Sequence, residues 1–225
     1  MIASWPCPHA DGKSADEYAL VFDRSRDARL LILPPLFEEA NKLRHLLVEV
    51  MRRLNGAGID SFLPDLPGCN ESLQPLAQQT LASWRGAGVA AAAHFRASHV
   101  LAVRASAILL PPGLPGWRYA PASGASALRA LLRSRMIAAR EAGVEERMDD
   151  LATGARQDGI ELAGYRIGPE LFGDLEDAHL PDPGGIVDIA QDSIGGSGLW
   201  LRAEPGFDAA QADALAAFLA IGMQP

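Results

Sequence analysis

The residues with the clearest chemical signature lie at 102–106, where Ala-Val-Arg-Ala-Ser ends the apolar run that starts at 99. This spacing matches the G-x-S-x-G motif, in which a nucleophilic serine occupies the apex of a tight strand-to-helix turn. Small residues, Ala102 and Ser106, stand at both glycine positions, so the turn is compatible with the sequence. The apex residue is Arg104, and a guanidinium cation cannot attack a carbonyl carbon. The pattern therefore predicts a nucleophile elbow that lacks its nucleophile.

The base of an acyl-transfer triad is missing from its usual place as well. In this arrangement the histidine follows the last strand of the sheet, which we predict at 198–204. No histidine comes after that segment. The five histidines are His9, His45, His94, His99 and His179. We expect His45 on the exposed face of a helix, whereas His179 could still swing over the site.

Three other side chains are weak candidates for a nucleophile. Ser106 would lie inside the turn, where a serine more often hydrogen-bonds backward to a carbonyl. Ser72 follows a strand, in a loop where a hydroxyl commonly caps the next turn. Cys69 has a suitable thiol, but no histidine is obviously near it. The sequence thus identifies no catalytic residue.

Arg104 needs a partner, because a cation at the start of a helix opposes the helix dipole. Glu38 and Glu39 are expected at the same edge of the sheet, and an ion pair with one of them is favoured over ligand binding. Both roles are compatible, since open α/β sheets bind ligands at the carboxyl ends of their strands. We predict a site there for a small polar, anionic or sugar-like ligand, or for a partner's side chain. Its expected residues are Phe37, Glu38, Glu39, Asn41, Arg44 and Arg104.

Metal and nucleotide motifs are lacking. The chain contains no H-x-x-x-H or H-E-x-x-H pattern, no Walker-type loop and no G-x-G-x-x-G fingerprint. The sequence therefore predicts neither a metal site nor a cofactor.

The elements that would position these residues alternate between strands and helices. The continuous apolar run at 28–35 is typical of a strand buried on both faces. We predict two further strands, one at the start of 59–72 that runs into a loop and one at 99–103. Between them, 38–58 carries one apolar helical stripe, and 75–95 is a second helix. The order βαβαβ predicts an α/β fold with a mostly parallel sheet and helices on both faces.

The sequence also predicts the organisation of the chain beyond this core. Residues 1–16 are polar and rich in proline, and we expect a loose lead-in. A single domain then covers 17–225, with an insertion at about 113–158. The segment 111–124 holds a proline and glycine cluster and is expected to be a loop, while 198–204 is expected to be a strand. A capped helix follows Asp208.

The composition narrows the functional classes. The 225 residues carry a net charge of -8, which argues against nucleic-acid binding. Two cysteines are too few for a disulfide framework, and no leader or membrane-spanning segment is recognisable. We therefore expect a cytoplasmic protein.

Four motifs resemble one family in particular. They are PPLFEEANKLR (34–44), DLPGCNES (65–72), LLRSR (131–135) and IELAGYRIGPEL (160–171). Together they resemble the α/β-hydrolase superfamily and, within it, the exosortase A system-associated hydrolases of the hydrolase 2 group. The resemblance extends from about 18 to 205 and implies a reduced α/β-hydrolase fold.

The resemblance also carries functional expectations. It implies a bacterial cytoplasmic protein that accompanies envelope protein sorting and exopolysaccharide production. It further implies that arginine is usual at the elbow, in a form like G-L-R-x-G, although Ala102 and Ser106 depart from those glycines here. The word hydrolase in the family name reflects fold and does not establish activity.

Whether the protein is an enzyme therefore stays open. We expect an atypical or non-catalytic protein that binds a ligand, or a partner from the exosortase and exopolysaccharide system. One alternative is an ester or thioester hydrolase that uses non-standard residues. Another is a protein-binding scaffold with an exposed apolar patch near the insertion.

Overall fold

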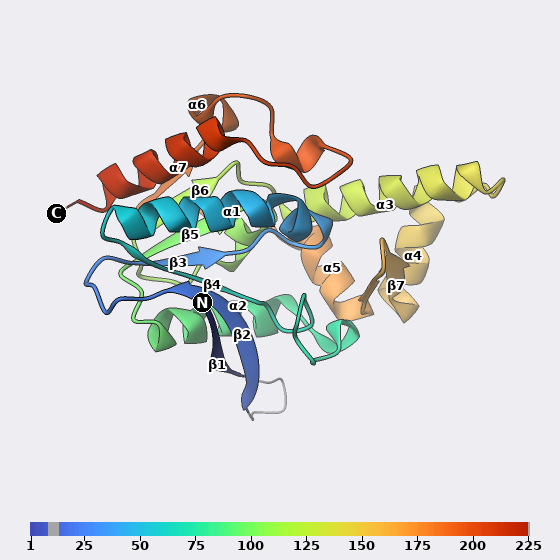
Figure 1. The fold of residues 1–225 in the computed structure, drawn as a ribbon. Coiled ribbons are helices and arrows are strands. Elements are labelled where there is room, and N and C mark those ends of the chain that lie inside the picture. The colour runs from blue at the N-terminus through green and yellow to red at the C-terminus, as the bar shows by residue number, and fades with distance from the viewer. Residues whose placement is uncertain (9–13, 225) are drawn as a thin grey trace.

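A computed structural model describes residues 1–8 and 14–224 of the chain. Its centre is a seven-stranded sheet in the order β1-β2-β4-β3-β5-β6-β9 (Figure 1). The strands are β1 (Ile2–Pro8), β2 (Ser14–Phe22), β3 (Arg29–Leu33), β4 (Asp60–Pro64), β5 (His99–Val103), β6 (Gly116–Tyr119) and β9 (Ile186–Ile189).

The five strands from β4 to β9 pair in parallel, and β1 and β2 are antiparallel to their neighbours. Every residue of β3 and β4 is buried. The apolar run at 28–35 predicts this burial for β3, whereas β4 also buries the polar residues Asp60 and Ser61. The predicted α/β class with a mostly parallel sheet is confirmed.

Helices cover both faces of the sheet. Helices α1 (Glu38–Gly56) and α7 (Ala209–Gly222) lie on one face, and α2 (Leu81–His94) lies on the other (Figure 1). The predicted apolar stripe of α1 is buried, from Leu43 through Leu54. Asp208 caps α7 by accepting hydrogen bonds from the backbone N–H groups of Ala210 and Gln211.

The N-terminal segment is ordered, so the prediction of a loose lead-in at 1–16 was wrong for the described part. Residues 2–8 form β1, which pairs with β2, while the remainder of the predicted lead-in at 9–13 lies outside the described residues. Trp5 and Cys7 are completely or almost completely buried. The prolines of this segment are tolerated because an edge strand needs fewer backbone donors.

A cap of helices and a small hairpin lies beyond the carboxyl edge of the sheet (Figure 1). It contains α3 (Gly124–Glu141), α4 (Met148–Asp158), β7 (Ile160–Leu162), β8 (Tyr165–Ile167) and α5 (Pro169–Asp177). The predicted insertion at 113–158 begins too early, because 116–119 is the buried strand β6. The inserted segment therefore starts after β6 and continues to β9.

The C-terminal region also differs from its prediction. The expected strand at 198–204 is absent, and residues 199–201 form a short 3₁₀ turn. The helix α6 (Gln191–Ile194) precedes it, so β9 is the last strand of the sheet on this side. This turn places Trp200 against Tyr119, with ring centroids 6.0 Å apart.

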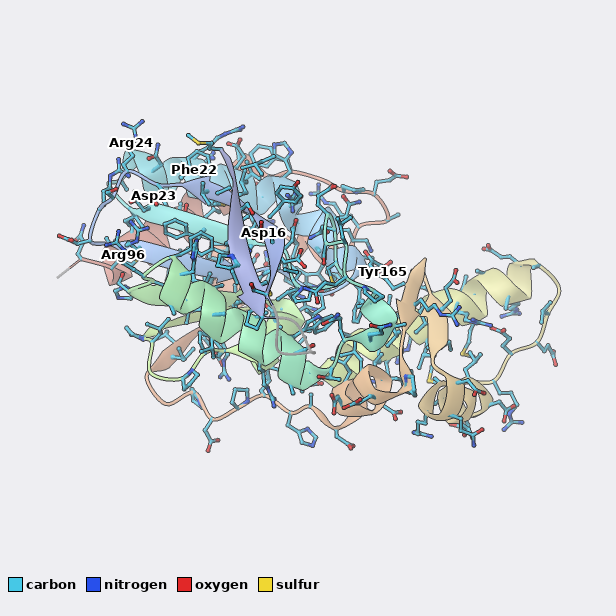
Figure 2. The ribbon with its side chains drawn as sticks, turned by 90° about the horizontal axis from the view of Figure 1, so that it is seen from below. Asp16, Phe22, Asp23, Arg24, Arg96 and Tyr165 are labelled. Atoms are coloured by element: carbon cyan, nitrogen blue, oxygen red, sulfur yellow. The ribbon has the colours of Figure 1, made fainter. Side chains whose placement is uncertain are left out.

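The amino end of the sheet is fastened by a buried ion network. The Arg29 guanidinium donates to Asp23 and Asp60, and Asp60 is fully buried. These hydrogen bonds lower the pKa of Asp23 to about 2. Figure 2 shows Asp23, Arg24 and Arg96 gathered at this end, away from Tyr165 at the cap. The chemistry predicted at the carboxyl edge is therefore separate from this network.

Candidate active site at the carboxyl edge

Arg104 lies at the sharp turn where β5 ends and a short 3₁₀ helix (Arg104–Leu109) begins. Its φ of 58° is in the left-handed region, which a residue with a side chain occupies at a cost of roughly 1 to 3 kcal/mol. Two further residues at this edge, Phe37 after β3 and Ala120 after β6, also have positive φ, 55° and 44°. Strain is thus concentrated along the carboxyl ends of three adjacent strands.

The Arg104 side chain makes hydrogen bonds and a cation–π contact with three other segments of the chain. Its Nε and Nη2 donate to the two carboxylate oxygens of Glu39, at 3.1 and 3.3 Å, and Nη1 donates to the carbonyl of Ala120 at 2.6 Å. The guanidinium carbon lies 4.1 Å from the centroid of the Trp200 ring. Only 17% of the side chain is exposed. These contacts join the ends of β5 and β6, the start of α1 and the 199–201 turn.

Ser106 is part of the turn, and its hydroxyl is hydrogen-bonded within it. The residue is completely buried. Its hydroxyl accepts a hydrogen bond from the backbone N–H of Val103 and lies 3.0 Å from the carbonyl oxygen of Leu33. This is the backward bonding that the sequence predicts, and it braces the elbow against β3.

The turn at Arg104 is strained, follows β5 and lies beside the loop after β3. A strand-to-helix turn at this place is the position of the nucleophile elbow in α/β hydrolases. The chain has the α/β-hydrolase fold. In this fold the apex side chain normally reaches toward substrate, whereas here it bridges four segments of the protein itself.

Solved structures of α/β hydrolases are similar to this chain. They include the mouse alpha/beta hydrolase domain-containing protein 10, at 13% identity and a TM-score of 0.49, with 84% of this chain and 77% of that chain covered. The alpha/beta hydrolase GrgF from Penicillium has the same identity and TM-score, 13% and 0.49, with coverages of 80% and 73%. An esterase from Pyrococcus furiosus has 10% identity and a TM-score of 0.41, with 59% of this chain covered.

The chain spans less than two thirds of the length of two of the similar structures, 56% of the Pyrococcus esterase and 60% of a protein from Agrobacterium vitis. At such identities the similarity concerns the fold alone. No protein-family model and no curated protein matches the sequence.

The six residues predicted to form one site are divided into separate groups. Glu39 and Arg104 are together, as predicted. Glu38 pairs instead with Lys42, 3.5 Å away, and Asn41 is exposed on α1. Arg44 faces Asp65, with 3.6 Å between Nη1 and Oδ1. The predicted cluster is therefore divided among three separate ion pairs.

Phe37 is buried, and its ring packs between Trp84 and Tyr165, with centroid distances of 6.0 and 5.4 Å. Tyr165 belongs to the cap hairpin, so these aromatic rings fasten the cap to the loop after β3. The cavity between this loop and α3 measures about 20 Å³. It holds little more than one water molecule.

Cys69 and Ser72 are also engaged in structure. Burial, together with the carboxylates of Asp65 and Glu17, raises the pKa of the Cys69 thiol to about 12. The Ser72 hydroxyl donates to Glu17 at 2.7 Å and accepts from the N–H of Gly68, in keeping with the predicted cap of a turn. Neither side chain resembles an activated nucleophile, since a reactive cysteine needs a lowered pKa.

The described histidines pack against aromatic rings or lie on the surface. His45 is exposed and stacks on Phe207, as expected for the outer face of α1, and His99 stacks on Trp117 at the opposite end of β5 from Arg104. His94 packs near Trp5, and His179 is exposed after α5, while His9 lies outside the described residues. Within residues 1–8 and 14–224, no group of three or more histidine, cysteine or acidic side chains could hold a metal.

Three residues of the edge were missed by the sequence. Trp200 was assigned to a strand, and the Ala120 carbonyl has no side-chain signal. Glu17 is buried, and its Oε1 accepts hydrogen bonds from Ser72 and Gln74.

Among the described residues, no helix combines the length and apolar character of a bilayer crossing.

Proposed function

We propose that this protein is a non-catalytic member of the α/β-hydrolase fold that acts by binding a small polar or anionic ligand or a protein partner. The observation that carries the proposal is the position of Arg104. A guanidinium stands at the strained apex and is committed to Glu39, the Ala120 carbonyl and Trp200. A group so engaged stabilises the edge of the sheet and has little freedom to bind a substrate.

The surroundings support the same conclusion. The hydroxyl of Ser106 is bonded inside the turn, and the Cys69 thiol is protonated at neutral pH because its pKa is raised to about 12. Removal of the nucleophile or base from a triad typically slows acyl transfer by several orders of magnitude. The family resemblance adds a setting: a cytoplasmic protein beside exosortase and exopolysaccharide systems.

A scaffold that binds a protein is the second candidate. On the projecting end of α3 and the turn after it, Ile137 and Val144 are 61% and 53% exposed. Arg133 and Arg140 are exposed on the same helix of a protein whose net charge is -8. An acidic partner segment with apolar side chains would complement this surface.

Ester turnover tests the proposal. The purified chain is incubated with p-nitrophenyl acetate, p-nitrophenyl butyrate and an acyl thioester. We expect hydrolysis at the rate of a heat-denatured control, unchanged by Cys69→Ala or Ser72→Ala. Saturable turnover that one of these substitutions abolishes would establish an ester or thioester hydrolase with non-standard residues and overturn the proposal.

A further inference from the structure

A second cavity is lined by residues of β1, β2, α1 and the loop after β4, and by none of the elbow. It measures about 400 Å³, within the size range of pockets that bind small molecules. Its apolar wall comes from Ile2, Tyr18 and Leu20, and its polar wall comes from Arg44, Asp65 and Glu71. Arg44 was predicted as a ligand-binding residue, but its partners in this cavity were not.

The pairing of β1 with β2 builds the apolar wall. Ile2 lies opposite Leu20, and Tyr18 lies opposite Ser4. Strand alternation sends Trp5 and Glu17 into the core on the opposite face of the ribbon. The ribbon forms one edge of the sheet (Figure 1), and Tyr18 stays 48% exposed. An aromatic ring is thus presented at the mouth of the cavity.

The polar wall contains an incompletely paired cation. The Arg44 side chain is 43% exposed, and its 3.6 Å approach to Asp65 is longer than a hydrogen bond. Asp65 is almost completely buried, and its Oδ1 accepts a hydrogen bond from the Asn70 amide at 2.8 Å. Burial raises the pKa of this carboxyl. Glu71 is exposed beside it, so donors and acceptors lie side by side.

This arrangement selects among ligand classes by charge. An anion would meet the carboxylates of Asp65 and Glu71, and a cation would meet the Arg44 guanidinium. A hydroxyl group both donates and accepts hydrogen bonds, whereas guanidinium only donates and carboxylate only accepts. Neighbouring hydroxyls can therefore bridge the two without a net charge. The C–H face of a sugar ring would also complement the apolar body of Tyr18.

We propose that this cavity binds a neutral saccharide, with hydroxyl groups between Arg44 and the two carboxylates and a ring face against Tyr18. The site lies away from Arg104 and uses none of the elbow contacts. It rests on the proposed function for a binding role, but saccharide binding and ester turnover are measured separately. Failure of one is therefore distinguishable from failure of the other.

The test is saturation-transfer NMR and calorimetry of the full chain with D-glucose, D-galactose, D-mannose and maltose. We expect saturable binding of at least one of them. Tyr18→Ala and Arg44→Ala should each weaken it on the order of tenfold, since each removes one wall. Tyr18→Phe, which keeps the ring, should bind nearly as well. Arg52→Ala is the matched control, because Arg52 is on the same helix and 60% exposed.

Three results would overturn the proposal. The first is no binding of any neutral sugar. The second is binding that persists unchanged in both wall variants, which would place the sugar elsewhere. The third is selective binding of charged probes, for which glucose 6-phosphate, glucosamine and free glutamate are included. Thermal melting of each variant confirms that it is folded, as expected for exposed side chains.

Discussion

Arg104 occupies a backbone conformation that disfavours side chains, yet its side chain makes three hydrogen bonds and stacks on an indole. The contacts and the strain act in opposite directions on stability. Removal of a partly buried guanidinium leaves the Glu39 carboxylate without its bidentate partner. Replacement by glycine removes the same contacts but also the strain.

We therefore expect Arg104→Ala to lower the free energy of unfolding by about 1 to 3 kcal/mol. Arg104→Gly should be more stable than Arg104→Ala by roughly 1 kcal/mol, because φ of 58° suits glycine. Urea denaturation measures both values. Arg133→Ala, on the exposed face of α3, is the control and should change little. An alanine variant as stable as wild type would show that the Arg104 contacts do not stabilise the fold.

The pairing of Arg104 with Glu39 could be predicted from sequence, because loops after neighbouring parallel strands meet at one edge. The inclusion of Arg44 in that cluster was wrong for a geometric reason. Arg44 lies five positions after Glu39, and five positions along a helix rotate the side-chain direction about the helix axis by about 140°. Arg44 therefore faces Asp65 and the larger cavity. The contact of Trp200 depends on tertiary packing and has no sequence signal.

Secondary-structure elements were predicted well where packing and pattern agree. Helix α1 follows from its apolar periodicity, and strands β3, β4 and β5 follow from short segments rich in apolar residues. Strand β6 was missed because prolines and glycines surround it. Gly116 is nevertheless required there, since a Cβ would lie 1.9 Å from the Val100 carbonyl oxygen. The strand predicted at 198–204 does not form, because residues 199–201 adopt a 3₁₀ turn that places the Trp200 ring against the Arg104 guanidinium.

The cap is fixed to the rest of the fold by a close backbone contact. A Cβ at Gly168, before α5, would lie 2.1 Å from the carbonyl oxygen of Ala77. The side chain of Asp174 in α5 also accepts a hydrogen bond from the N–H of Leu81, at the start of α2. The cap residues Leu171, Phe172 and Leu175 are completely buried in the core shared with α2.

Gly168→Ala should therefore loosen the cap and destabilise the protein by about 1 to 3 kcal/mol. Gly173→Ala, inside α5, is the matched control, because nothing lies within 4 Å of the added methyl group. It should be neutral or stabilise by up to about 1 kcal/mol, because alanine favours helix. Hydrogen exchange of 124–177 measures the loosening. Equal protection in the two variants would contradict a cap fixed at this contact.

At the scale of the whole molecule, the α/β-hydrolase fold is joined to a cap that packs against the carboxyl edge of the sheet. The cap shares its core with α2, aromatic rings fill the space beside Phe37, and a cation bridges the elbow to its surroundings. The order of strands and helices was sufficient to predict the α/β class, and the four motifs added the resemblance to α/β hydrolases. Neither predicted how the cap packs, because that packing depends on tertiary contacts.

The most direct measurement of the central claim is covalent labelling with a fluorophosphonate, read by intact mass. Such a reagent modifies hydroxyl or thiol nucleophiles that a protein activates. We predict an unchanged mass for the wild-type chain, for Arg104→Ala and for Cys69→Ala. The contradicting result is a stoichiometric adduct on a serine or on Cys69 of the native protein that does not form when the protein is heat-denatured before labelling. It would show that the folded protein contains an active nucleophile.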